Sequence, residues 1–331
     1  MKKLKINTLL FFAGVTLVFL GCKKEPETLF ISKTNPVPTV AYTSPRDFNL
    51  KMMPATQSFK IDASKAIKIT TASGSTFSFD AGSFYNTSGL INSGNIDIKI
   101  TEVNKTSEMM ATGAGTEATN GILASAGMFK IEASMNGTPV ALYMLRPIKV
   151  EIPASNDAKV DGFKLFKGIE NSTKDKVTWV EAPQDSSGTS DSIRLEKIGQ
   201  KKIFSFRLNF LNWCNLDRFF NATGGESIRV KIEGDYGNLN TNVYVLFTLP
   251  DGPKGMVQLF SNQDKKEWNT SNYNLPYNNK YTLICTAINL VTKQLEYAIM
   301  DMQHQADKTY TFEKLTPISE EDLEAKFKAL K

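Results

Sequence analysis

The sequence has very little of the residue chemistry on which most metal and nucleophile sites are built. Its 331 residues include one histidine, His304, and three cysteines. Zinc sites with two or three histidines are therefore excluded, and a Ser-His-Asp or Cys-His constellation would have to use His304. Because His304 follows a strand-like segment at a turn between Asp301 and Asp307, we expect it to be solvated and to take no part in catalysis.

Motifs that hold phosphates, metals or redox centres are also missing. The chain contains no glycine-rich loop followed by lysine, no Cys-x-x-Cys and no Asp-x-Asp-x-Asp-Gly calcium loop. We therefore expect no metal and no cofactor. Glycoside cleavage needs only two acids that are close in space, so a hydrolase of an envelope polymer stays open, as the least favoured interpretation.

The chain has no large excess of one charge. Its formal net charge is +5, but three of the 39 basic residues are lysines within the first five positions. Without residues 1–21, 36 basic side chains remain against 34 acidic ones, and the lysines are spread among strand-like segments. Nucleic-acid binding needs a clustered basic face, so we expect no nucleic acid as a partner.

The chain also lacks an apolar run long enough to cross a membrane. The longest run covers residues 9–20 after a lysine-rich start, whereas a spanning helix needs about 20 apolar residues. This arrangement is typical of a secretory signal peptide. The run ends in Gly21 and Cys22 and gives way at once to Lys23, Lys24 and Glu25.

Gly21 and Cys22 at the end of such a signal resemble the lipobox of bacterial lipoproteins. The resemblance implies cleavage before Cys22, a diacylglycerol on its sulfur and an acyl chain such as palmitate on its new amine. Several chains hold a protein firmly on a bilayer. Lys23 in place of aspartate implies the outer membrane, with the remaining chain facing either the periplasm or the cell surface.

The other two cysteines, Cys214 and Cys285, form an even pair in a chain that leaves the reducing cytoplasm. A disulfide between them is one interpretation. Both lie in apolar surroundings, so two buried free thiols are an equally good one.

Periodicity predicts a mainly β protein with two or three antiparallel β-sandwich-like domains and a short C-terminal amphipathic helix. Apolar and polar residues alternate over 96–101, 148–153 and 228–233, which is typical of strands with one buried face. Leu323, Phe327 and Leu330 recur at helical spacing after Ser319, which predicts a helix over 319–330. The expected organisation is a signal at 1–21, a proline-containing tether at 22–54, a first sandwich at 55–153, a β-rich linking segment at 154–223 and a second sandwich at 224–331.

The segment 55–153 weakly resembles the ZU5 family of interaction modules. The resemblance rests on GSTFSFDAGSFYNTSGLINSGNIDIKI, MFKIEAS and RPIKVEIPA. It implies a β-sandwich scaffold. Self-cleavage at a His-Phe-Ser site, which some members perform, is not implied, because Thr76 precedes Phe77 and Ser78 here.

Two aromatic segments are candidates for contacts with other molecules. FLNWCNLDRFF at 210–220 is better explained as a core between domains, with Asp217 and Arg218 paired at its rim. KEWNTSNYNLPYNNKY at 266–281 offers Trp268, Tyr273 and Tyr277 beside asparagines, a combination suited to sugars or peptides. Inward packing of these rings around a turn-rich loop is the alternative.

The sequence thus indicates an outer-membrane lipoprotein, anchored to the bilayer by Cys22, with a non-catalytic scaffold or interaction role toward an envelope protein or glycan. A surface glycan- or peptide-binding protein is the main alternative.

Overall fold

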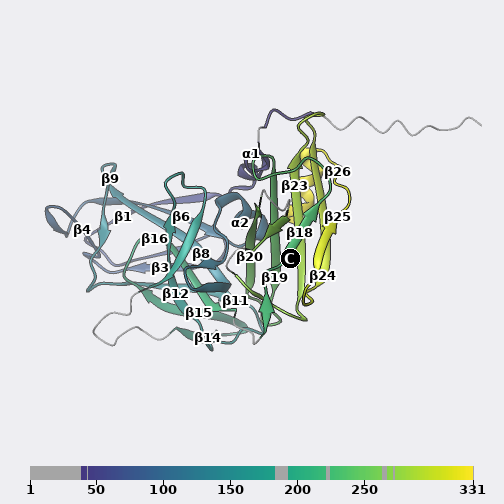
Figure 1. Cartoon of the computed structure of the whole chain (residues 1–331). Helices are drawn as coiled ribbons and strands as arrows, with labels where there is room; N and C mark the ends of the chain where they lie inside the picture. Colours follow the sequence, from purple (N-terminus) through teal and green to yellow (C-terminus); the bar gives the residue numbers. More distant parts are fainter. Residues whose placement is uncertain are drawn as a thin grey trace, which may run out of the picture. The chain divides into compact units, whose positions relative to one another are not determined.

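The structure is a computed structural model that describes residues 39–42, 44–182, 193–220, 224–262, 267–270 and 273–330 (Figure 1). It confirms a mainly β fold with antiparallel sheets and a short C-terminal helix. No helix in these ranges is both long enough and apolar enough to cross a membrane.

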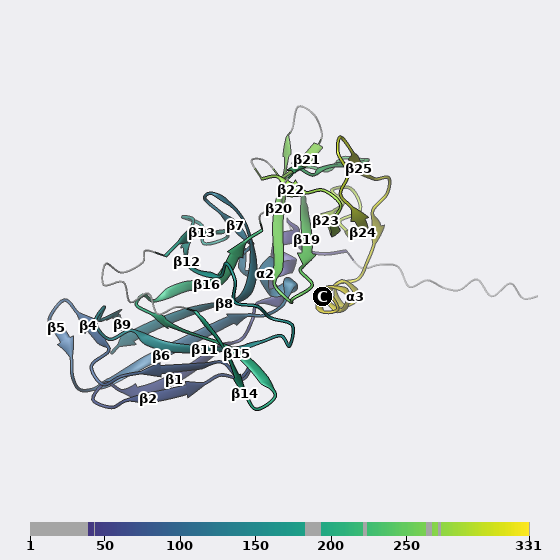
Figure 2. The same cartoon turned by 90° about the horizontal axis from the view of Figure 1, so that it is seen from below.

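A first sandwich packs two antiparallel sheet layers face to face (Figure 2). One layer runs β1 (Thr56–Asp62), β6 (Asn95–Val103), β8 (Gly121–Met135), β16 (Asn212–Phe219), β12 (Lys164–Glu170) and β13 (Val177–Glu181). The other runs β14 (Arg194–Ile198), β15 (Lys201–Leu208), β11 (Ile148–Ala154), β3 (Thr76–Phe79) and β2 (Ile67–Thr70). Short strands extend these layers: β4 (Phe84–Asn86), β5 (Gly89–Ile91), β7 (Glu117–Ala118), β9 (Thr138–Pro139) and β10 (Ala141–Leu142).

The alternation read from the sequence produces the core of this sandwich. Ile96, Ile98 and Ile100 of β6 are fully buried, while Lys99 between them is exposed. They meet aromatic side chains of the opposite layer, because successive strand residues point to opposite faces.

The predicted boundary at residue 153 is wrong as a structural boundary. Strands β12, β13 and β16 belong to the same layer as β6 and β8, and β15 pairs with β11 along its length. The segment 154–223 therefore completes the first sandwich. Without it, one layer would lack β12, β13 and β16 and the other would lack β14 and β15, so the two layers could not bury each other's inner faces.

A second sandwich follows in sequence. Its larger layer runs β20 (Lys254–Asn262), β19 (Thr241–Thr248), β23 (Lys280–Ile288), β24 (Leu295–Gln303) and β26 (Thr316–Pro317). The facing layer contains β21 (Glu267–Asn269), β18 (Arg229–Ile232) and β25 (Thr309–Phe312). A two-stranded piece, β17 (Gly225–Glu226) with β22 (Leu275–Pro276), lies at one end. The two sandwiches share main-chain pairing where Lys254 of β20 meets Ser125 of β8.

A third apolar cluster, the middle core, combines residues of both sandwiches with the helices α1 (Pro45–Asn49), α2 (Thr106–Thr112) and α3 (Glu320–Lys328) and the 3₁₀ turn Leu50–Met52. Figure 2 shows α2 where β8 approaches β20, and α3 near the C-terminus. Trp213 lies in this cluster, as expected for the aromatic segment 210–220. Residues Val37–Lys331 accordingly form one compact unit.

The ends of the chain's described part are folded against this core. Phe48 and Met52 are buried in it, so the last part of the predicted tether 22–54 belongs to the folded unit. The predicted C-terminal helix is confirmed: Ser319 accepts a hydrogen bond from the Asp322 amide at 3.1 Å, and Leu323 and Phe327 are buried.

Candidate functional site

The structure corrects the expectation for Trp268, the first of the three proposed binding residues. Its side chain is 1% exposed and lies in the core of the second sandwich on β21, between β18 and β20. A ring in that position stabilises the fold and cannot contact a ligand. The inward-packing interpretation is therefore correct for Trp268, and also for Tyr281, which is buried.

Tyr273 and Tyr277 keep part of their surface. The Tyr273 hydroxyl donates a hydrogen bond to the Ala118 carbonyl at 3.0 Å, which links the loop before β22 to β7. Burial raises the pKa of the Tyr273 phenol, so the hydroxyl remains a donor. Tyr277 lies against His304, with ring centroids 5.2 Å apart, and is not among the described residues that line the cavity beside Tyr273.

Tyr273 lines an open cavity of about 650 Å³, here called the Tyr273 hollow. Its lining comes from four places in the sequence: the turn between β7 and β8 with the start of β8, the end of β16, the start of β17, and β22 with the residues before it. The described lining residues are Thr119, Asn120, Gly121, Ile122, Phe220, Gly224, Gly225, Tyr273, Asn274 and Pro276.

The walls of the Tyr273 hollow are held together by main-chain hydrogen bonds. The Phe220 amide donates to the Ile122 carbonyl at 2.8 Å, and the Thr119 amide donates to the Trp179 carbonyl at 3.0 Å. Glycine is required at Gly225, because a Cβ there would lie 2.5 Å from the Leu275 carbonyl oxygen. The hollow is thus largely formed before any ligand arrives.

No described residue that lines the Tyr273 hollow carries a charge. It offers exposed amides of Asn120 and Asn274, the Thr119 hydroxyl, and the half-exposed rings of Phe220 and Tyr273. Amides and hydroxyls both donate and accept hydrogen bonds, and rings cover apolar faces. This chemistry suits an uncharged polar ligand such as a sugar or a peptide segment.

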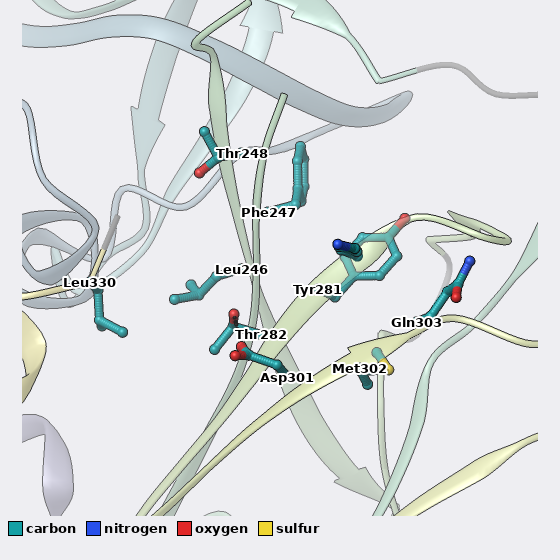
Figure 3. A pocket seen from close by; sticks show the side chains of 10 residues that line it. Leu246, Phe247, Thr248, Tyr281, Thr282, Asp301, Met302, Gln303 and Leu330 are labelled. Atoms are coloured by element: carbon teal, nitrogen blue, oxygen red, sulfur yellow. Dashed lines mark hydrogen bonds between the residues drawn. The ribbon is translucent and has the colours of Figure 1, made fainter. Parts of the chain in front are cut away.

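A second pocket, the strand-end pocket, lies on the larger layer of the second sandwich and has a volume of about 570 Å³. Figure 3 shows Leu246, Thr282 and Asp301 grouped near Leu330, with Tyr281 and Gln303 farther from it. The Thr282 hydroxyl donates to Asp301 at 2.6 Å. Unlike the Tyr273 hollow, this pocket carries charged side chains, Lys280 and Asp301.

His304 is buried, so the expectation that it would be solvated is wrong. Its Nε2 donates to the Glu226 carbonyl at 3.3 Å, and among described atoms its Nδ1 has no partner. The rings of Tyr277, Tyr281 and Tyr310 surround it. Burial lowers the pKa of His304, so its main effect is structural: the neutral ring joins the end of β24 to β17, the strand whose Gly225 lines the Tyr273 hollow.

Cys214 and Cys285 are free and fully buried, one in each sandwich core. Of the two interpretations that the sequence allowed, the structure therefore has the free thiols and not the disulfide. Burial raises the pKa of both thiols, which keeps them protonated and unreactive.

Sequence reasoning missed the buried acids Glu102, Glu117, Asp217 and Glu296, of which Asp217 and Glu117 are the least exposed. Asp217 is fully buried and accepts from the Asn215 amide at 2.6 Å, and burial raises its pKa well above the usual range. The expected pair between Asp217 and Arg218 does not form, because Arg218 binds Asp251 at 2.6 Å. A β-bulge between Leu216 and Asp217 shifts this part of the strand, and periodicity alone does not reveal a bulge. Glu117 is also buried, 3.4 Å from the Lys176 ammonium.

The described residues contain no group of three or more histidine, cysteine, aspartate or glutamate side chains that could hold a metal ion. Cys22, the proposed lipid-attachment residue, lies outside the described residues. No protein-family model matches the chain, and a search of curated proteins finds no match either.

Proposed function

We propose that this protein is an envelope lipoprotein, anchored to the outer membrane by lipid on Cys22, whose two sandwiches bind another envelope molecule and perform no chemistry. The Gly21-Cys22 pair at the end of an apolar run supports the anchor. The partners are the bilayer itself and an envelope protein or glycan, on the periplasmic or the outer side of the membrane.

The observation that carries the binding role is the Tyr273 hollow. It is large enough for a few sugar or amino-acid residues, its walls are held by main-chain hydrogen bonds, and its described lining is uncharged. These properties favour recognition of a neutral polymer segment. They also favour the glycan- or peptide-binding form of the proposal over a purely mechanical scaffold.

The location is tested by proteinase K digestion of intact cells that express a tagged chain. Cys22→Ser is the matched control, because it removes only the sulfur that would carry lipid. We expect the wild-type chain to fractionate with the outer membrane and the Cys22→Ser chain to be released. Equal release of both chains would contradict the anchor, and digestion in intact cells would favour the outer surface.

The binding role is tested with the chain from residue 23 on an array of envelope glycans and peptides. Asn120→Ala and Asn274→Ala should each weaken binding severalfold without changing the unfolding midpoint, since both amides are exposed. Asn156→Ala, at an exposed turn after β11, is the matched control. Binding that ignores both hollow variants would contradict a site there.

A further inference from the structure

The outer side of β24 is open over most of its length. Within the described residues, β24 pairs with β23 along its whole length, but its other side pairs only with β26, at Glu296 and Tyr297. The stretch from Ala298 to Gln303, here called the β24 edge, has no strand partner on that side among the described strands, and at its end the Gln303 carbonyl accepts a hydrogen bond from the Tyr310 hydroxyl at 3.0 Å.

Two main-chain hydrogen bonds define which residues face outward. The Asn289 amide donates to the Gln294 carbonyl at 2.9 Å, on the β23 side. The Ile318 amide donates to the Leu295 carbonyl at 2.9 Å, on the opposite side. Because main-chain groups alternate along a strand, Ile299 and Asp301 direct their N–H and C=O groups outward, ready for an added strand.

The β24 edge lacks the features that keep other edges of this molecule unpaired. Exposed edges are usually blunted by lysine, proline or bulges. The edge strands β1 and β2 carry the exposed Lys60 and Lys68, and β14 carries Arg194 and Lys197. The β24 edge reads AIMDMQ, with no basic residue and no proline, and Ile299 is 37% exposed.

Asp301 gives this edge its one charge. Its carboxylate accepts a hydrogen bond from the Thr282 hydroxyl at 2.6 Å, and none of the ion pairs between described residues includes it. Ile299 and Asp301 lie on the same face of β24, two positions apart. Two residues of an added strand would therefore stand opposite an exposed apolar side chain and an unpaired carboxylate.

We propose that the β24 edge binds an extended segment of another protein as an added strand, with a basic side chain opposite Asp301 and an apolar side chain opposite Ile299. The inference rests on the proposed interaction role and gives the kind of partner for a second surface. Main-chain hydrogen bonds supply affinity in such complexes, and side chains at alternate positions supply specificity.

A second copy of this chain fits the β24 edge poorly. In antiparallel self-pairing, outward-facing residues pair with outward-facing residues. The residue opposite Asp301 would then be the other copy's Asp301, Ile299 or Gln303, none of which is basic. Two such edges would therefore pair without any cation opposite the Asp301 carboxylates, which disfavours dimer formation. A partner strand with a basic residue at that position is favoured instead.

The test uses the chain from residue 23 and the fluorescent peptide acetyl-Thr-Val-Thr-Lys-Thr-Val-Thr-amide, measured by anisotropy. Its valines flank lysine symmetrically, so either strand orientation places valine opposite Ile299 when lysine is opposite Asp301. We expect binding, weakened roughly fivefold or more when the peptide lysine is replaced by glutamate. No binding up to the solubility limit of the peptide overturns the proposal.

Variants of the chain locate the binding. Asp301→Lys should reverse the preference, so that the glutamate peptide binds better. Ile299→Pro should abolish binding of both peptides while the fold is kept, since the amide that proline removes points away from β23. Glu196→Lys on the β14 edge is the matched charge control and should change nothing. Unchanged binding in Asp301→Lys and Ile299→Pro overturns the proposal.

Two further measurements distinguish peptide binding at the β24 edge from self-association and from binding in the Tyr273 hollow. Sedimentation that shows a dimer abolished by Ile299→Pro would replace the proposed partner with a second copy. Asn274→Ala alters the Tyr273 hollow and should leave peptide binding unchanged, so failure of the hollow and failure of the β24 edge are distinguishable.

Discussion

The two sandwiches differ in what they bury and in how their edges end. The first buries an acid, Asp217, and its open strands β1, β2 and β14 carry basic residues. The second buries its histidine, His304, together with the acid Glu296, and leaves the β24 edge without a basic residue. The Tyr273 hollow opens between the start of β8 and the β17–β22 pair of the second sandwich. The open strands of the first sandwich thus carry basic residues that oppose pairing, whereas the second sandwich keeps main-chain groups of β24 available to a partner; the exposed amides of the Tyr273 hollow come from both sandwiches.

The largest effect should come from the buried tryptophans, one of which was expected to bind a ligand. Trp268→Ala should lower the free energy of unfolding by about 3–5 kcal/mol, because it leaves a large cavity in the second core. Trp179→Ala, at a fully buried ring of the middle core, should cost at least as much, since the Trp179 Nε1 donates to the Gly115 carbonyl at 2.6 Å. Urea unfolding measures both changes. An unchanged midpoint for Trp268→Ala would restore the binding interpretation.

Much of the fold could be predicted because strand alternation is a local signal. The isoleucines of β6 and β18 and the spacing of Leu323 and Phe327 already determine which faces are buried. The boundary at residue 153 could not be found in this way. The pairing of β12 and β16 with β8 joins segments far apart in sequence, and alternation does not show which strand is the neighbour.

The candidate site was predicted only in part for a related reason. Tyr273 and Trp268 look alike in sequence, as rings among asparagines, but one faces a cavity and the other a core. The opposite wall, Thr119 to Ile122, lies about 150 positions earlier and has no recognisable motif. The buried states of His304 and Asp217 likewise depend on tertiary contacts.

The next effect should come from Asp217. Burial raises the pKa of this carboxyl, so the native state keeps a proton that the unfolded state releases above about pH 4. Stability is therefore lost as pH rises through the unfolded pKa toward the native one, by up to about 1.4 kcal/mol per pH unit. Asp217→Asn should remove this slope and be more stable than wild type at pH 8. Urea unfolding at pH 5 and pH 8 measures it, with Asp97→Asn as the control at a half-exposed carboxyl of β6. Parallel profiles for wild type and Asp217→Asn would contradict a protonated Asp217.

His304 should respond in the opposite direction and more weakly. Its native pKa is lowered by burial, while Glu226 offsets part of that effect. The unfolded state takes up a proton below about pH 6.5, and the native state does so only at lower pH. The contribution of neutral His304 to the free energy of unfolding is therefore fully present above pH 6.5. It falls as the pH drops below 6.5 toward the native pKa. His304→Gln should flatten this decline. Hydrogen exchange of β17 and β22 between pH 7.5 and 5.5 measures it, and an equal decline in both proteins would mean that His304 is not the titrating group.

The smallest change in stability should come from the edges, although the change in association should be clear. Lys60→Val removes the basic residue from the exposed part of β1. Its ion pair with Asp97, at 3.7 Å, is solvent-exposed, so the free energy of unfolding should change by no more than about 0.5 kcal/mol. Self-association measured by sedimentation should rise, because a flat apolar edge is open to pairing. Ile299→Lys performs the reverse exchange on β24 and should reduce peptide binding with an equally small effect on unfolding. If Lys60→Val stays monomeric, Lys60 is not what prevents the β1 edge from pairing with another chain. The difference between the edges of the first sandwich and the β24 edge would then depend on strand twist or length.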